Sequence, residues 1–509
     1  MFRVACHSVE EGEIKLMNIT TDSIEHHQPR RGLSFPEGQL AFLFLLLGIG
    51  GAVILATVQR ATFSTALLFV FVAVYGLMSC RIAQTNLGDP KLKILGYFWL
   101  IKLGLTLFVL YMGWIPQLDA TTSSSWGYDP QRYYLYAQEL IKNNWQPEII
   151  NYVGVLYYYG AILYVFGNNP VTPALINSFV TLIASLYLIK VGYLIKRQRG
   201  SFDWTIAWVL LLPEIIFFDV MTSRETIMGA LIIFVLLTMG LYFLRNTVIS
   251  LIRVIIVVGL SLLAITVIRT SMMIPVLTTI VLMMFMIKQQ AGTFITRRII
   301  SLFLIFSLLF TGLILNIFLG GFEFDALKLL LKATSANQNL TTQLYSGSQN
   351  SIGMLLFPEG IIQSILFLPL RMGIYLVTPL PNISVSLINM WEGNYTDWQK
   401  LFSLLSSAIN VVVMPYVFAS LVQSIKSRKE NSAPLIFNIS YWATFIAISG
   451  GNLIIDERYR VMASLLLWGC AWLGWTTCSK SLIKKTSILW YGFLTFGTLF
   501  YIIYKSGIL

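Results

Sequence analysis

Apolar segments of about 20 residues, long enough to cross a bilayer as a helix, recur along almost the whole chain. A water-soluble fold cannot bury so many of them. The composition agrees, because 56% of the residues are hydrophobic, 11% are charged and the mean hydropathy is +0.74. The sequence therefore predicts an all-α polytopic membrane protein. Thirteen candidate spans lie near 38–57, 61–79, 94–115, 173–193, 205–219, 226–244, 250–268, 270–287, 299–319, 402–424, 435–454, 459–476 and 487–505.

Two further apolar windows, 151–166 and 361–380, are ambiguous by length and composition. The positive-inside rule distinguishes the alternatives, because cytoplasmic loops collect Lys and Arg. If both windows span, the basic loops fall on opposite sides. If both are juxtamembrane or re-entrant helices, almost all of those loops share one side, so we expect about thirteen transmembrane helices and a cytoplasmic N-terminus. The basic clusters are Arg81/Lys91/Lys93, Lys196/Arg197/Arg199, Arg245/Arg253, Lys288/Arg297/Arg298, Lys426/Arg428/Lys429 and Lys480/Lys484/Lys485.

This topology divides the chain into a cytoplasmic N-terminal tail, residues 1–36, and a single transmembrane domain, residues 37–509. Two long extracytoplasmic loops, about 116–172 and 320–401, each contain an amphipathic juxtamembrane helix. Only these loops offer room for a solvent-facing site. The tail is polar and partly acidic, unlike a cleaved signal peptide. The predicted location is the plasma (inner) membrane, and the lipid bilayer is the first expected partner.

The basic residues and the metal-binding residue types argue against two classes of function. The net charge of +12 is spread in twos and threes between apolar runs, so no nucleic-acid partner is predicted. The four cysteines have no metal-like spacing, and all three histidines lie in the first 36 residues. No metal site or cofactor is predicted from these patterns, although one carboxylate and a phosphate-bearing substrate can together hold a divalent cation.

Ionisable residues at the membrane boundary are costly to bury, so they are expected to be paired, to extend toward lipid headgroups or to be functional. Under the predicted topology nine of them share the extracytoplasmic face, and one cavity there would gather several. These nine are Asp129, Arg132, Arg224, Glu225, Arg269, Arg371, Glu457, Arg458 and Arg460.

Asp129 is the candidate catalytic residue of this set. It precedes Pro130, which suits the first turn of a helix, so its carboxylate can act as an N-cap. It can also take the proton of an acceptor hydroxyl, or position that acceptor. The other eight are candidate substrate-binding residues: guanidinium groups suit a phosphate or diphosphate, but they also extend toward lipid headgroups. Glu225 and Glu457 each adjoin an arginine and can be simply its counter-ion.

Several features follow one another in a recognisable order. Tyr128-Asp129 is followed by Tyr133 and Ala137, then by the stretch NYVGVLYYYGAILYVFG at 151–167, a helix and a basic turn at 196–199. This order resembles the GT-C superfamily of membrane glycosyltransferases, most closely its protein-mannosyltransferase and aminoarabinose-transferase-like branch. The later run Glu457-Arg458-Tyr459-Arg460 resembles an Arg-Tyr element of such enzymes and of related polysaccharide polymerases. The resemblance covers about residues 94–245 and 435–476.

The resemblance implies a polyprenyl-phosphate or polyprenyl-diphosphate sugar donor and a multi-helix membrane fold with amphipathic helices on the outer face. It also implies an acidic residue in the first extracytoplasmic loop that serves as base or acceptor anchor. Asp129 matches that acid, and Pro130 stands where the family often has a second one.

The sequence thus favours a membrane glycosyltransferase that moves a sugar from a polyprenyl-phosphate-linked donor to a glycan, lipid or protein acceptor, in cell-envelope polysaccharide biosynthesis. One alternative is a polymerase of lipid-linked oligosaccharide repeats (O-antigen or exopolysaccharide), which would depend on arginines more than on one carboxylate. Another is a flippase or transporter of lipid-linked saccharides, which typically shows two-half repeats that this sequence lacks. A purely structural membrane protein would need no cluster of ionisable residues.

Overall fold

The computed structural model describes residues 61–88, 90–120, 129–147, 153–196, 204–244, 251–287, 361–378, 386–391, 395–451 and 457–505. Across these residues the backbone forms helices and turns and no strand, which confirms the all-α class. The predicted tail 1–36, the predicted spans 38–57 and 299–319, and residues 320–360 of the second predicted loop lie outside the described residues. Residues Arg60–Leu509 group into one compact unit.

Most of the longer described helices coincide with apolar windows of the sequence, whereas α5 and α16 lie in the predicted loops. In chain order they are α2 (Ala61–Leu87), η2 (Pro90–Lys93), α3 (Ile94–Val109), η3 (Leu110–Trp114), α4 (Ile115–Ala120), α5 (Asp129–Lys142), α6 (Val153–Phe166), α7 (Val171–Lys196), η5 (Trp204–Leu211), α8 (Pro213–Val220), α9 (Glu225–Leu244), α10 (Leu251–Arg269), η6 (Thr270–Met272), α11 (Met273–Met286), α15 (Ile361–Val377), α16 (Leu387–Trp391), α17 (Tyr395–Lys426), α18 (Leu435–Gly451), α19 (Glu457–Thr477) and α20 (Lys480–Lys505).

Six helical segments among the described residues are long and apolar enough to cross a membrane. They are Ser64–Leu87, Lys91–Trp114, Val171–Ile195, Glu225–Leu244, Leu251–Met286 and Asp397–Lys426. The fifth contains both α10 and α11, which the sequence predicts as two spans. Helix α6 has 14 residues, about 21 Å at 1.5 Å per residue, and is too short for a hydrocarbon core of about 30 Å. That length suits the predicted surface helix, and the total of thirteen spans stays a prediction.

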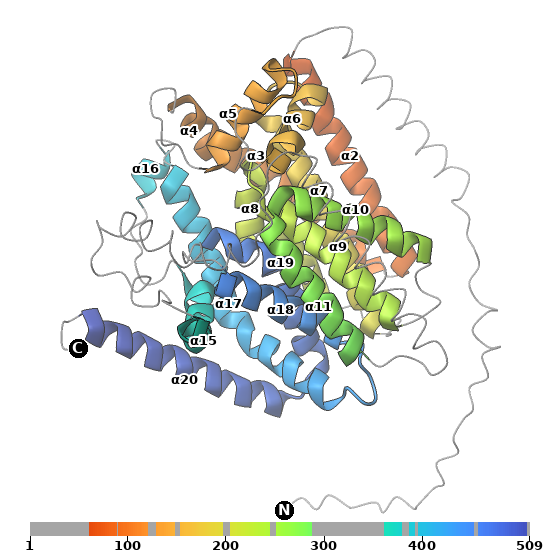
Figure 1. The fold of residues 1–509 in the computed structure, drawn as a ribbon, viewed down its shortest axis with the longest axis vertical. Coiled ribbons are helices and arrows are strands. Elements are labelled where there is room, and N and C mark those ends of the chain that lie inside the picture. Colours follow the sequence, from red (N-terminus) through yellow and green to blue (C-terminus); the bar gives the residue numbers. More distant parts are fainter. Residues whose placement is uncertain are drawn as a thin grey trace, which may run out of the picture. The chain divides into compact units, whose positions relative to one another are not determined.

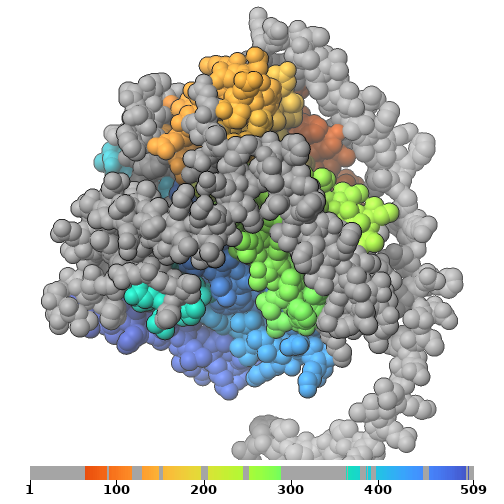
Figure 2. All heavy atoms as spheres, in the orientation of Figure 1, coloured from red at the N-terminus to blue at the C-terminus, as the bar shows by residue number. Residues whose placement is uncertain are grey.

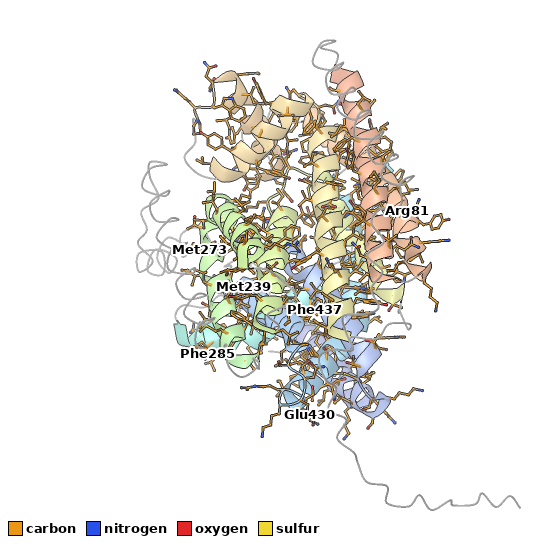
Figure 3. The ribbon with its side chains drawn as sticks, turned by 90° about the vertical axis from the view of Figure 1, so that its right-hand side faces the viewer. Arg81, Met239, Met273, Phe285, Glu430 and Phe437 are labelled. Atoms are coloured by element: carbon orange, nitrogen blue, oxygen red, sulfur yellow. The ribbon has the colours of Figure 1, made fainter. Side chains whose placement is uncertain are left out.

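Helix α19 lies among α9, α17 and α18 and packs against all three (Figure 1). The side chains between these helices are buried and apolar: Met239 of α9 and Phe437 of α18 lie in the interior, whereas Phe285 of α11 is exposed (Figure 3). In Figure 2 the green atoms of α11 border the blue atoms of the C-terminal helices, in agreement with the packing of α11 on α18. Large apolar side chains exposed in this way suit contact with lipid.

Two glycines allow neighbouring helices to approach closely. A side chain at Gly474 of α19 would overlap the backbone carbonyl of Tyr416 in α17, and one at Gly154 of α6 would overlap the carbonyl of Val267 in α10. Small residues are common where membrane helices pack, because they let the backbones meet. Gly154 thus brings α6 against the end of α10 that carries Arg269.

The predicted span at 205–219 is not one continuous α-helix. Residues Trp204–Leu211 form the 3-10 helix η5, and α8 begins at Pro213. Proline lacks a backbone donor and disfavours helical geometry in the residue before it, and Leu212 accordingly is extended, with φ −62° and ψ 121°. A second break follows: Met221 is extended and ends α8, and α9 begins at Glu225. We call residues 221–224 the α8–α9 turn.

Helices α5 and α6 pack against each other and carry the first candidate residue. Helix α5 begins at Asp129 with Pro130 in its first turn, as the sequence predicts. After α5, Asn144 and Trp145 adopt positive φ angles of 52° and 66°, and the N–H of Trp145 donates to the carbonyl of Leu140 at 2.8 Å, which ends the helix. The Tyr157 hydroxyl of α6 donates to the Trp145 carbonyl at 2.9 Å and fixes the connection.

Candidate active site

Asp129 and Arg458, which are 329 positions apart in the sequence, form an ion pair. Arg458 Nη1 donates to Asp129 Oδ2 at 2.9 Å, and the two side chains are 24% and 28% exposed. Asp129 stands at the start of α5 and Arg458 in the first turn of α19. A pair with this exposure is accessible to a ligand, unlike the fully buried pairs of this chain. The structure therefore joins two of the predicted site residues directly.

Tyr459 places a second arginine beside this pair. The guanidinium groups of Arg269 and Arg458 both lie over the ring of Tyr459, each 4.9 Å from its centroid, and Arg458 Nη2 donates to its hydroxyl at 3.1 Å. The negative face of an aromatic ring attracts cations, so one ring can hold two guanidinium groups that would otherwise repel each other. Tyr459 was recognised in the sequence only as part of the Arg-Tyr element.

The α8–α9 turn adds a third arginine to the group. Arg224 Nε lies 3.5 Å from Glu225 Oε1, and these side chains are 11% and 5% exposed. The Arg269 guanidinium interacts electrostatically with Arg224, Glu225 and Arg458. We call Arg224, Arg269 and Arg458 the arginine cluster. With Asp129 and Glu225 as its two carboxylates, it carries one net positive charge, which favours an anionic ligand.

The remaining predicted residues have different surroundings. Arg132 is half-buried and lies on α5 one turn after Asp129. Arg371 is only 2% exposed and lies on α15. Helix α19 begins at Glu457, whose side chain lies outside the described part of the chain. Their predicted roles in substrate binding stay predictions.

Arg460 is enclosed by protein acceptors. Its Nε donates to Glu214 Oε2 at 2.8 Å, and the pair is 1% and 3% exposed. Its Nη1 donates to the carbonyls of Tyr375 at 2.8 Å and Thr378 at 3.0 Å, at the C-terminal end of α15. The last carbonyls of a helix have no N–H partner within the helix, and an arginine side chain can donate hydrogen bonds to them in this way. This placement favours a structural role, in which Arg460 ties α19 to α8 and α15.

Two buried carboxylates and a buried lysine were not selected from the sequence. Lys102 Nζ lies 2.9 Å from Asp219 Oδ2 with both side chains fully buried, and Glu214 pairs with Arg460. The signal was present, because Lys102, Glu214 and Asp219 are isolated charges within apolar windows, and such charges are usually functional or paired. The prediction missed them because it interpreted these apolar windows only as membrane spans.

Within the described part of the chain, no three His, Cys, Asp or Glu side chains gather as a metal site would require. Neither a protein-family model, nor a curated protein, nor a solved structure matches the chain. The chemistry of the site itself therefore indicates what it can do. It combines a partly exposed carboxylate, three guanidinium groups and an aromatic ring, all at helix ends.

Proposed function

We propose that this protein is a membrane glycosyltransferase that transfers a sugar from a polyprenyl-phosphate-linked donor to a glycan, lipid or protein acceptor. The observation that carries the proposal is the 2.9 Å pair that Asp129 forms with Arg458 of the arginine cluster. The reaction needs both kinds of group: a carboxylate to accept a proton, and cations to stabilise a phosphate leaving group. The resemblance of the sequence to the GT-C superfamily supports the same assignment.

In the proposed reaction the acceptor hydroxyl attacks the anomeric carbon of the sugar and inverts it. The bond from that carbon to the phosphate oxygen breaks, and its electron pair leaves with the polyprenyl phosphate. Asp129 takes the hydroxyl proton, or holds the acceptor in place. Arg224, Arg269 and Arg458 neutralise the charge that develops on the departing phosphate.

The pair of Asp129 and Arg458 suggests how donor binding prepares the site. In the structure the Asp129 carboxylate accepts a hydrogen bond from Arg458 Nη1. A donor phosphate that takes this hydrogen bond would separate the pair and leave the carboxylate available to the acceptor. The carboxylate then acts as a base only when the donor is present, which would limit loss of the activated sugar.

The proposal includes the topology that the basic loops favour. It comprises thirteen spans in the plasma membrane, a cytoplasmic N-terminus, and the arginine cluster with Asp129 on the extracytoplasmic side. The short helices α5 and α6 would then lie along the outer membrane surface. A polyprenyl chain in the bilayer could extend its phosphate to the cluster while the acceptor approaches from solvent.

A polymerase that joins lipid-linked oligosaccharide repeats is the second candidate. The observation that favours it is the convergence of three arginines around Tyr459 and Glu225, because both the donor and the acceptor of such an enzyme carry a lipid phosphate. A flippase for lipid-linked saccharides would use the same cations without forming a glycosidic bond.

The test uses purified protein in sealed proteoliposomes and a panel of radiolabelled polyprenyl-phosphate and polyprenyl-diphosphate sugars. We expect Asp129→Asn to lower kcat by about a hundredfold or more, because a general base is lost. We expect Arg458→Ala to weaken donor binding, and the exposed Arg428→Ala to change neither. Lipid movement across the bilayer without a new glycosidic bond would establish the flippase instead, and full activity of both site variants would refute the assigned roles.

A further inference from the structure

A polar network inside the apolar core leads from a buried ion pair to the α8–α9 turn. Lys102 lies near the middle of the apolar helix Lys91–Trp114, and Thr181 near the middle of Val171–Ile195. Lys102 Nζ donates to Thr181 Oγ1 at 2.6 Å and lies 2.9 Å from Asp219 Oδ2, and Thr181 Oγ1 donates to Asp219 Oδ2 at 2.7 Å. All three groups are buried. Together the ion pair and Thr181 join α3, α7 and α8 at one point.

Asn177 connects the ion pair to the turn. Its Nδ2 lies within hydrogen-bonding distance of the carbonyl of Asp219 at 3.3 Å and of the carbonyl of Met221 at 2.9 Å. It also lies 3.2 Å from the hydroxyl of Tyr159. One buried amide thus contacts the last turn of α8 and the first residue of the α8–α9 turn.

Two hydroxyl groups hold the next residues of the turn. The Tyr159 hydroxyl donates to the carbonyl of Ser223 at 2.6 Å, and the Thr222 hydroxyl donates to the carbonyl of Pro130. The first of these bonds ties the turn to α6. The second ties it to the start of α5, next to Asp129. Arg224 and Glu225 follow immediately.

We infer that Lys102 and Asp219 are positioning residues. Through Asn177 and Tyr159 they fix the α8–α9 turn, and so they hold Arg224 where it completes the arginine cluster. The ion pair bonds to Thr181, and Asn177 links the backbone of Asp219 to the turn, so the pair acts on the cluster through the turn. An apolar core would need no such pair for packing alone, because well-packed hydrophobic residues stabilise a helix bundle at least as well as a buried pair does. The inference rests on the proposed function for the nature of its ligand, a lipid-linked phosphate.

The first arm of the test measures hydrogen exchange of peptides that cover residues 219–228, with no ligand present. We expect Lys102→Met and Asp219→Asn to speed exchange there. Tyr159→Phe removes only one hydroxyl, and we expect it to do the same even if the charge variants fail to fold. The matched control is Thr238→Val, which removes the partly buried hydrogen bond of 2.8 Å to Tyr187 far along α9 and should leave the turn unchanged. Unchanged exchange at 219–228 in folded Lys102→Met and Asp219→Asn, or in folded Tyr159→Phe where the charge variants do not fold, would overturn the inference.

The second arm measures binding of polyprenyl phosphate, with the phosphate-free polyprenol as the reference. We expect Lys102→Met, Asp219→Asn and Tyr159→Phe to weaken binding, by about tenfold for the two charge variants. In an Arg224→Gln background they should add almost nothing, because they act through that arginine. Fully additive effects would overturn the inference. If the wild-type protein does not bind polyprenyl phosphate, the proposed function fails, and the exchange arm still decides whether the network positions the turn.

Discussion

Two arginines of α19, Arg458 and Arg460, lie two positions apart and have opposite surroundings. Arg458 is partly exposed and pairs with Asp129, whereas Arg460 is 1% exposed and donates to Glu214 and to the end of α15. An exposed pair contributes little to stability, but breaking a buried pair leaves one charge uncompensated. The same residue type in one helical turn is therefore left accessible to a ligand at one position and is enclosed by protein at the other.

From this contrast we expect Arg460→Met to destabilise the protein strongly, by about 3–5 kcal/mol, because Glu214 would stay buried without its cation. Arg458→Met should cost less than about 1 kcal/mol. Thermal unfolding in detergent measures both, and the exposed Arg428→Met is the reference. Equal losses for the two α19 variants would show that Arg460 does not have the structural role assigned here. Glu214→Met combined with Arg460→Met should recover part of the loss.

At the scale of helices, the close contact of α19 with α17 depends on Gly474. A methyl group there would meet the Tyr416 carbonyl, so Gly474→Ala forces the helices apart and should cost about 1–3 kcal/mol. A Cβ atom added at Gly492 of α20 would meet no neighbouring atom within 4 Å. Gly492→Ala should therefore be neutral, or stabilising by up to about 1 kcal/mol, since glycine disfavours a helix. A Gly474→Ala protein as stable as the wild type would contradict the packing of α17 on α19.

The sequence predicted helices well where a single local signal determines them. It predicted the backbone less well where contacts with residues distant in the sequence determine its conformation. Pro130 marks the start of α5, and the length of the apolar run at 151–166 indicates a short helix. The gap between the predicted spans 205–219 and 226–244 indicates a connection at the α8–α9 turn, but no local signal sets its conformation. Its conformation depends on Asn177 and Tyr159, which the chain brings to it from α7 and α6. Pro213 is a local signal for the break before α8, and the predicted span at 205–219 did not take it into account.

The candidate site shows the same limit at the scale of the whole molecule. Opposite charge and a shared membrane face were enough to place Asp129 and Arg458 in one group, and the structure pairs them. The same argument placed Arg460 in that group, because the sequence cannot show which side of α19 meets α8. Glu214, the partner that decides it, lies 246 positions away inside an apolar window.

The thirteen-span topology places two exposed residues on opposite sides of the membrane. Gln146 follows α5 in the first predicted outer loop, and Glu430 lies in the turn between α17 and α18 (Figure 3), beside predicted cytoplasmic basic residues. In a variant whose native cysteines are replaced by serine or alanine, we expect an impermeant thiol reagent outside intact cells to label Gln146→Cys. It should label Glu430→Cys only after the cells are opened. Labelling of both from the same side would refute the topology, and with it the placement of Asp129 and the arginine cluster outside. Labelling of Glu392→Cys from outside would extend the same orientation to the second loop, because an odd number of crossings then separates it from Glu430.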